Sequence, residues 1–176
     1  MAAARDSVDD HLDRWSALWT DVDGYDREVE GALSRMMSIT KLSSQRLRTL
    51  LRHDPLSYDE FMTLHALVGG EVKEQARSTP AELAKRTGVT RAGMTSRVDK
   101  LVRAGLATRT EDPKDRRSIV IEITPDGRAA WDRIITLWTH EEQRLLSALS
   151  VTELRRLNVL LRRVLITAEA DATSER

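Results

Sequence analysis

Apolar residues recur every three or four positions along most of the chain, which is the spacing of one face of an α-helix. A first amphipathic stretch covers residues 7–19, and a longer one covers residues 27–52. Asp54-Pro55 ends the longer stretch, because a residue that precedes proline avoids the helical region. The pattern predicts five further helices, at residues 58–68, 80–87, 91–104, 125–148 and 151–169.

Polar residues at the edges of these stretches agree with helix ends. Ser57, Thr79 and Ser150 each precede a glutamate by three positions, which is the pattern of a capping box. Glycines are expected to end the helices that they follow, at positions 69–70, 88 and 105. A turn is expected over residues 21–26, around Gly24.

The helical period breaks at residues 106–124, where two strands are expected. The first covers Leu106–Thr110, and the second, Ser118–Thr124, alternates Ile119, Ile121 and Ile123 with less apolar positions. The charged residues 111–117 between them predict the turn of a hairpin. The predicted fold is therefore mainly α with a small β wing.

Two short helices joined at residues 87–89, with a hairpin soon after, match the order of a winged helix-turn-helix. The second helix turns Met94, Val98, Leu101 and Val102 inward. The opposite face carries Arg91, Ala92, Thr95, Ser96 and Asp99. Small and hydroxylated side chains let a helix approach base edges closely, and arginine can pair with guanine. We expect Arg91, Thr95 and Ser96 to contact base edges, with Ala92 as a further DNA-binding residue. An alternative is a winged-helix module that uses the same elements to bind a protein.

Charge strengthens the DNA-binding interpretation. The 176 residues include 28 basic and 28 acidic side chains, so the net charge is zero. Residues 85–117 hold ten basic and four acidic side chains, a local charge of +6 that suits a nucleic-acid face. Phosphate contacts are expected from Lys85, Arg86 and Lys100, and wing contacts from Lys114, Arg116 and Arg117. Arg116 is the predicted minor-groove probe, whereas Arg117 either joins it or pairs with Asp112 or Asp115.

Other classes of protein find little support. The chain has no cysteine, which excludes disulfides and thiolate metal sites. The four histidines are scattered, and the sequence contains no metalloprotease HExxH, no glycine-rich phosphate loop and no GxSxG motif. We therefore expect no catalytic residues, no metal and no cofactor. No apolar run approaches the roughly 18 residues of a membrane span, and no secretory signal opens the chain, so a cytoplasmic location is expected.

Two motifs resemble a known family. Residues 111–127, EDPKDRRSIVIEITPDG, look like the wing signature of MarR-type transcription regulators, and residues 101–106, LVRAGL, resemble the end of that family's recognition helix. The resemblance implies an obligate homodimer that reads pseudo-palindromic double-stranded DNA. It also implies repression as the default outcome. The lobe at 54–127 would bind DNA, and residues 1–53 and 128–176 would form the dimer interface.

The apolar stripes favour a dimer independently of that resemblance. Long stripes run through residues 131–149 and 154–165 and would expose much apolar surface on a single copy. Large exposed apolar patches usually mark interfaces. The alternative is that these stripes pack on residues 27–52 of the same copy, and both arrangements can hold in part.

Arg97 is the residue that suggests a ligand. Its spacing from Met94 and Leu101 places it on or beside the inward face, where arginine needs an anionic partner. Trp15, Asp59, Arg97 and Arg109 resemble the pocket residues of urate-responsive MarR regulators, which implies a small anionic effector that releases DNA. The alternatives are a constitutive regulator with Arg97 paired to Asp59 or Glu60, a packing role for Trp15, and a phosphate contact for Arg109.

Overall fold

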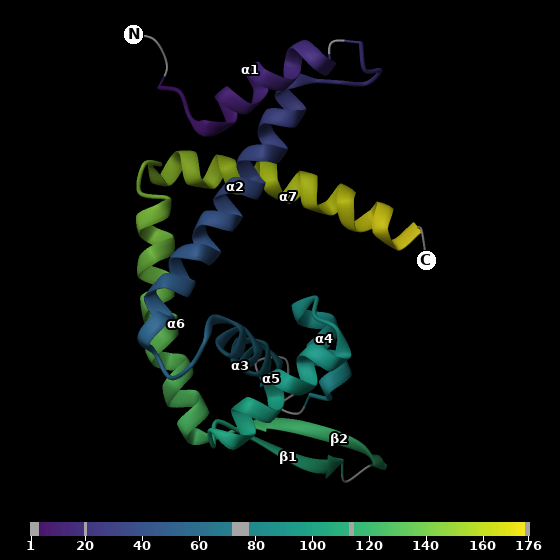
Figure 1. The fold of residues 1–176 in the computed structure, drawn as a ribbon, viewed down its shortest axis with the longest axis vertical. Helices are drawn as coiled ribbons and strands as arrows, with labels where there is room; N and C mark the ends of the chain where they lie inside the picture. The colour runs from purple at the N-terminus through teal and green to yellow at the C-terminus, as the bar shows by residue number, and fades with distance from the viewer. Residues whose placement is uncertain (1–3, 20, 72–77, 113–114, 175–176) are drawn as a thin grey trace. The chain divides into compact units, whose positions relative to one another are not determined.

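The computed structural model describes residues 4–19, 21–71, 78–112 and 115–174, without the side chains at 71 and 115–117. The chain divides into two compact units, residues 1–58 and residues 59–176. Each unit is built mainly of helices, and the second also carries a two-stranded hairpin (Figure 1).

The first unit is a pair of helices and a short helical turn. Its elements are α1 (Ser7–Trp19), α2 (Arg27–Leu50) and the 3-10 turn η1 (Leu51–His53). The expected turn between α1 and α2 forms, and Gly24 adopts a positive φ of 79° within it. Asp26 then caps α2 by accepting hydrogen bonds from the backbone amides of Glu28 and Val29.

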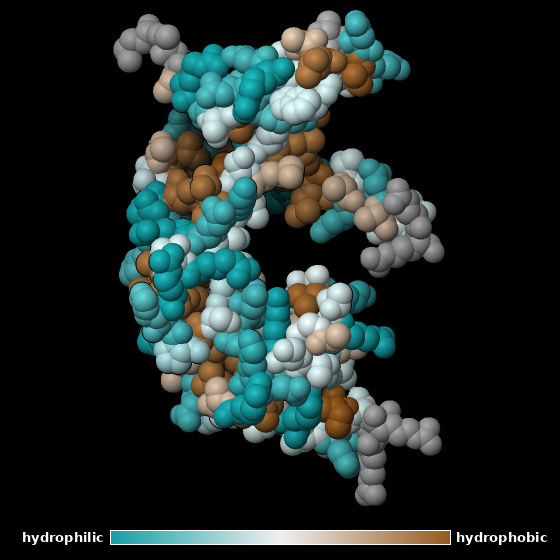
Figure 2. All heavy atoms as spheres, in the orientation of Figure 1, coloured by the Kyte–Doolittle hydropathy of each residue, from teal (hydrophilic) through white to brown (hydrophobic). Residues whose placement is uncertain are grey.

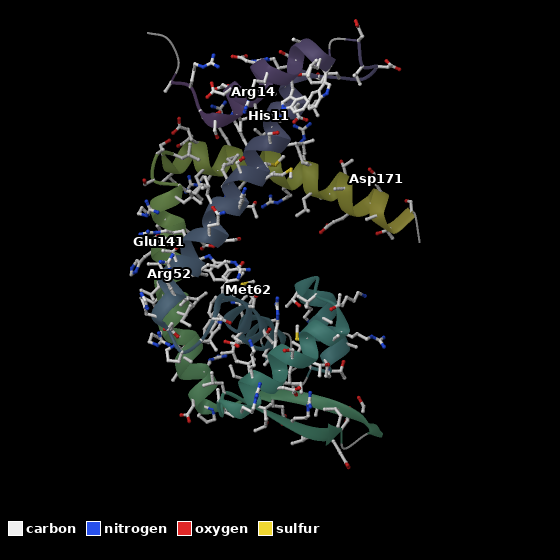
Figure 3. All side chains as sticks on the ribbon, in the orientation of Figure 1. His11, Arg14, Arg52, Met62, Glu141 and Asp171 are labelled. Carbon is white, nitrogen blue, oxygen red and sulfur yellow. The ribbon has the colours of Figure 1, made fainter. Side chains whose placement is uncertain are left out.

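Apolar contact and charge both join α1 to α2. Val8 and Leu12 are the buried residues of α1. Arg35 on α2 pairs with Asp6 and Asp9 at 2.8 and 2.6 Å. His11, which is labelled in Figure 3, extends from α1 toward α2, where its Nε2 lies 3.2 Å from Oε1 of Glu30. Because the Arg35 guanidinium donates to Asp6, the pKa of that carboxyl lies below its usual value.

The second unit holds the helix-turn-helix, the hairpin and two long helices. Its elements are α3 (Tyr58–Glu71), α4 (Pro80–Thr87), α5 (Arg91–Arg103), β1 (Ala107–Asp112), β2 (Asp115–Ile123), α6 (Pro125–Leu145) and α7 (Val151–Ser174). The core takes at least one fully buried side chain from most of these elements. It contains Phe61, Leu64 and Leu67 of α3, Leu83 of α4, Met94, Val98 and Leu101 of α5, Ile121 of β2 and Ile134 of α6.

Aromatic contacts join α3 to α6. The ring of Trp138 meets Phe61 edge-on with centroids 5.5 Å apart, and the ring of Trp131 stacks on His65 with centroids 6.1 Å apart. The indole N–H of Trp131 donates to Nδ1 of His65 at 3.1 Å. This cluster orients α6, the helix that follows the hairpin in the chain.

The helix stop expected at Gly69-Gly70 is wrong, because α3 continues through both glycines to Glu71. Positive φ angles occur at Gly24, Gly88 and Gly105 among the described glycines, so Gly69 does not adopt the left-handed conformation that ends a helix. A glycine inside a helix costs about 1 kcal/mol relative to alanine. Burial of Leu67 and Val68 on the same helix offsets this cost.

The hairpin is longer than the sequence predicts. Its strands include Glu111, Asp112 and residues 115–117, which the sequence analysis assigned to the turn. Backbone pairing continues from Glu111 opposite Ile119 to Asp112 opposite Asp115, with a register shift between the two pairs. Ladder hydrogen bonds join backbone groups, so charged side chains that reach solvent do not prevent them.

Two details of the predicted apolar faces also need correction. Val120 is buried although the alternation placed it opposite the isoleucines, and Ile119 is 38% exposed. An isolated bridge joins Ser78 to Ile121 at the second edge of β2, so the hairpin packs against a segment that the alternation of its own residues does not reveal. Val102, predicted to face the core of the helix-turn-helix, is exposed as well.

The two long helices differ from their predicted lengths, since α6 ends at Leu145 rather than near 148 and α7 extends to Ser174 rather than 169. Ser150 opens α7 as expected, because its hydroxyl and the Glu153 carboxylate form a capping box. Within the part of the chain that the structure describes, no helix combines the length and hydropathy that crossing a bilayer requires.

Candidate nucleic-acid interface

The helix-turn-helix is built by capping residues that the sequence places at its corners. Thr79 and Glu82 form a complete capping box at the start of α4, with Pro80 in the first turn. Gly88 ends α4 with a φ of 67°, which glycine adopts without strain. Thr90 then caps α5 by accepting a hydrogen bond from the backbone amide of Gly93. These caps fix the sharp turn that brings α4 and α5 together.

The recognition helix α5 has one buried and one exposed face. Met94, Val98 and Leu101 are buried, and this side anchors the helix. Arg91, Ala92, Thr95 and Ser96 are exposed, as the sequence analysis expected, and we call these four residues the reading face. The Thr95 hydroxyl donates to the backbone oxygen of Arg91 at 3.0 Å, which holds this side chain close to the helix.

The wing is fastened to the helix-turn-helix through Ser78. The backbone of this buried residue exchanges hydrogen bonds with Ile121 of β2 at 3.2 and 2.8 Å. The Arg86 guanidinium of α4 donates to the Ser78 hydroxyl at 3.1 Å and to the backbone oxygen of Ala66 at 3.3 Å. Arg86, expected to contact phosphate, therefore has structural contacts that link α3, α4 and the strand β2.

The predicted contacts at the wing tip all involve side chains outside the described part of the structure. Lys114 lies outside the described residues. Arg116 and Arg117 lie in β2, but their side chains are outside the described part of the structure. Their assignment to DNA or to an internal pair stays a prediction.

Two ion pairs connect α5 to the first turn of α3. An Arg97 guanidinium nitrogen lies 3.4 Å from an oxygen of Asp59, and the Lys100 ammonium lies 3.4 Å from an oxygen of Glu60. The Arg97 side chain is 23% exposed, which agrees with its predicted place beside the inward face. The Lys100 side chain is 54% exposed, so its pair with Glu60 lies at the surface.

A third ion pair connects α5 to the wing. The Arg109 guanidinium of β1 lies 3.1 Å from an oxygen of Asp99, with the two side chains 37% and 46% exposed. The structure therefore brings together two of the four predicted effector residues, Asp59 and Arg97, and gives Arg109 a partner on the recognition helix.

Trp15, the fourth predicted effector residue, belongs to the other unit. It stacks on Trp19 within α1, with ring centroids 5.3 Å apart, and its side of the helix stays partly open to solvent. Trp19 in turn meets Tyr25 edge-on at 5.6 Å. The stack organises this end of the first unit, and a contact between Trp15 and an effector stays a prediction.

Sequence reasoning missed the pair of Asp99 with Arg109, the pair of Lys100 with Glu60 and the role of Arg86. The partners lie 8 to 40 residues apart and never on the same helix or strand, so helical spacing gives no signal for them. The sequence contains many other combinations of opposite charges, so charge alone does not single out these pairs. Among the described residues, no three histidine, aspartate or glutamate side chains gather as they would around a metal ion.

Comparisons with known proteins agree with this architecture. A sequence model of the MarR family matches residues 54–118. The transcriptional repressor YetL of Bacillus subtilis is 30% identical over 129 residues, which are 71% of this chain and 75% of YetL. The transcriptional regulator PecS of Dickeya dadantii is 29% identical over 157 residues, which are 89% of this chain and 92% of PecS.

A solved structure shows the same fold with DNA. A mutant of MarR from E. coli, crystallised with operator DNA, superposes with a TM-score of 0.62 at 26% sequence identity. The match covers 76% of this chain and 94% of the MarR chain. The similarity thus extends well beyond the helix-turn-helix.

Proposed function

The chain is a DNA-binding transcription regulator of the MarR family, and from this premise we propose that two copies bind one pseudo-palindromic operator and repress transcription from it. The exposed reading face of α5, opposite a fully buried anchoring face, is the observation that carries the DNA-binding part. E. coli MarR, a structural relative, was crystallised with operator DNA, and YetL is named a repressor. The relatives of this chain are transcription regulators, which argues against an enzyme.

Exposed apolar surface supports the proposal of a dimer. No described residue of α7 is buried, although the helix is rich in leucine, isoleucine and valine. Figure 2 shows apolar side chains at the surface over parts of α7. In the first unit, Leu33, Met37 and Leu42 of α2 are exposed too. A second copy would cover such surfaces, and a two-fold axis would place two recognition helices about one turn of DNA apart.

Binding measurements with selected DNA test the operator proposal. Duplexes are selected from a random library with the full chain, and affinity is then measured by fluorescence anisotropy at several salt concentrations. We expect affinity to fall steeply with salt, because basic side chains release counterions from the phosphates. The Arg91→Ala variant should lose about 1–3 kcal/mol of binding free energy.

Arg144→Ala is the matched control for that variant. Arg144 lies on α6 and pairs with Glu141 at 2.9 Å, so its loss removes an exposed arginine away from the reading face. Unchanged affinity is expected for this control. Weak binding that ignores salt, or equal losses for both variants, would favour the module that binds a protein.

For regulation, we propose that a small anion such as urate binds beside Arg97 and weakens operator binding. The support is the half-buried Arg97 side chain and its 3.4 Å contact with Asp59, which an anion would replace. A planar anion suits the flat arginine fork. Trp15 and Arg109 are the further predicted contacts of this effector.

The mechanism requires that the anion prefer the state that binds DNA poorly. An anion at Arg97 would repel the Asp59 carboxylate and break the tie between α5 and the first turn of α3. The recognition helix would then lose one of its fixed points. A coupling free energy of about 1–3 kcal/mol between effector and DNA is typical of such regulation.

Titration of urate into the complex of protein and selected DNA, at fixed salt, tests this proposal. We expect release of DNA together with a change in tryptophan fluorescence, and loss of both effects in Arg97→Ala. Arg103→Ala, an exposed arginine on the same helix, is the control and should keep the response. Release that survives Arg97→Ala would exclude the proposed site, and absence of release would exclude urate.

A constitutive regulator is the second candidate function. It is favoured by the same ion pair, because Asp59 already gives Arg97 an anionic partner within the protein. In that case urate would not change DNA binding by the wild type or by Arg97→Ala. The variant would only have a lower thermal midpoint than the wild type.

A further inference from the structure

We propose that Arg109 is a positioning residue for DNA binding, which neutralises Asp99 at the edge of the reading face and holds the wing against the recognition helix. The inference rests on the proposed operator binding. It assigns to Arg109 a role different from the predicted effector contact.

Asp99 lies on the exposed side of α5. It follows Thr95 by four positions and Ser96 by three, so helical geometry puts Asp99 on the same side as these residues, one turn further along. Asp99 is thus an acidic side chain beside residues that would lie in the major groove. A carboxylate near two phosphate backbones repels them, which weakens binding unless a cation compensates.

The side chain of Arg109 lies on the same face of the hairpin as Ile121. The two residues are directly opposite each other in the antiparallel ladder, and such residues share one face of a sheet. Ile121 is fully buried, and Ala107, two positions before Arg109 on β1, is buried. Arg109 therefore stands on the packed face of the hairpin, and its guanidinium reaches Asp99 at 3.1 Å.

The Arg109–Asp99 pair affects the DNA-binding surface in two ways. It neutralises the negative charge of Asp99 on the recognition helix, and it links this helix to the wing. These two elements would contact neighbouring grooves of DNA. Both side chains remain partly exposed, so the pair contributes little to folding stability. Its effect should appear in DNA binding more than in the thermal midpoint.

A double-mutant cycle with Arg109→Gln and Asp99→Asn tests the inference. Affinity for the selected duplex and its salt dependence are measured for each protein, with circular dichroism as the check of folding. We expect Arg109→Gln to weaken binding about two- to fivefold, the range of an exposed ion pair. Asp99→Asn loses the link to the wing but also the carboxylate that repels phosphate, so it should lose less affinity than Arg109→Gln. The double variant lacks both charges as well as the link, so it should bind about as Asp99→Asn does, with the wild-type salt slope.

Other outcomes would overturn the proposal in distinguishable ways. A double variant as weak as Arg109→Gln, with a salt slope reduced by about one, would make Arg109 a phosphate contact. Unchanged DNA affinity in Arg109→Gln, with loss of the urate response, would assign it to the effector. Arg144→Gln breaks an exposed pair with Glu141 outside the reading face and the wing, and it should leave affinity unchanged once light scattering shows the same mass as for the wild type. If the wild type itself shows no salt-dependent binding, the proposed function fails and this inference fails with it.

Discussion

Gly127 shows how a single residue fixes the exit from the wing. It lies in the first turn of α6, where its amide donates to the Thr124 hydroxyl at 3.0 Å. A Cβ atom at this position would lie 2.0 Å from the backbone oxygen of Leu106 and 2.8 Å from a carbon of Ile123. The space for a side chain is therefore absent, because the backbone just before β1 meets the backbone of the first turn of α6 directly.

The Gly127→Ala variant should lose at least about 2 kcal/mol of the free energy of unfolding, because the methyl group can be placed only by moving backbone. Gly69→Ala is the matched control, since nothing lies within 4 Å of its Cβ position in α3. There, alanine should stabilise the helix by up to about 1 kcal/mol. Thermal and urea unfolding at one protein concentration measure the stability of both variants. Equal midpoints for Gly127→Ala and Gly69→Ala would contradict the prediction.

At the scale of elements, the α3–α6 contact depends on a neutral histidine. His65 accepts the Trp131 indole N–H at Nδ1, and a doubly protonated imidazole has no lone pair for this bond. Burial lowers the pKa of His65 from its ordinary value of 6.5, and the nearby Glu142 opposes this in part. The unfolded chain therefore binds this proton more readily than the folded chain does.

Stability from this contact should be complete above the ordinary histidine pKa and should be lost as the pH falls below it. We expect the free energy of unfolding to drop between about pH 7.5 and about pH 5.5, and to drop less in His65→Gln, which does not titrate in this window. The lowered carboxyl pKa values of Asp6, Asp13 and Glu153 act at lower pH, where protonation removes their contributions. An equal drop in both proteins would remove His65 as the cause.

For the whole molecule, the main question is what covers the apolar side chains of the terminal helices. On α7 these are Val151, Val159, Leu160, Leu161, Val164, Leu165 and Ile166. Two pairs of arginines, Arg155-Arg156 and Arg162-Arg163, interrupt these aliphatic side chains along the helix. A helix with no buried residue and a regular set of aliphatic side chains suits an interface better than a solvent face.

The Leu165→Asp variant should therefore shift the protein from a dimer toward the 19.9 kDa monomer. A charge in the centre of an apolar interface is costly, so the dimer should dissociate. DNA affinity should then fall, because a monomer presents one recognition helix to the operator instead of two. Light scattering after size exclusion measures the mass at several concentrations. Asn158→Asp adds the same charge to an exposed polar position of α7 and should leave the mass unchanged. A wild type that is monomeric at every concentration would end the dimer proposal.

Local sequence determined the elements and most of their boundaries. Capping residues such as Thr79, Thr90 and Thr124 act on the backbone within three positions, so their effect can be predicted without a fold. The same holds for the left-handed turns at Gly88 and Gly105, and for the order of helices and hairpin that indicates the reading face. Gly69 does not end α3 as the sequence predicts, because glycine only weakens a helix and the burial of Leu67 and Val68 outweighs that cost.

The partners of the charged residues depend on tertiary structure. Arg97 was expected near an anion, and only packing chose Asp59 rather than Glu60, which pairs with Lys100 instead. The pair of Arg109 with Asp99 arises because the hairpin folds back on α5. Hydrophobic spacing is periodic and local, so it can be seen in the sequence. An ion pair requires two residues that are far apart in the chain to lie within a few ångströms of each other. That distance is set by tertiary packing and cannot be read from the sequence.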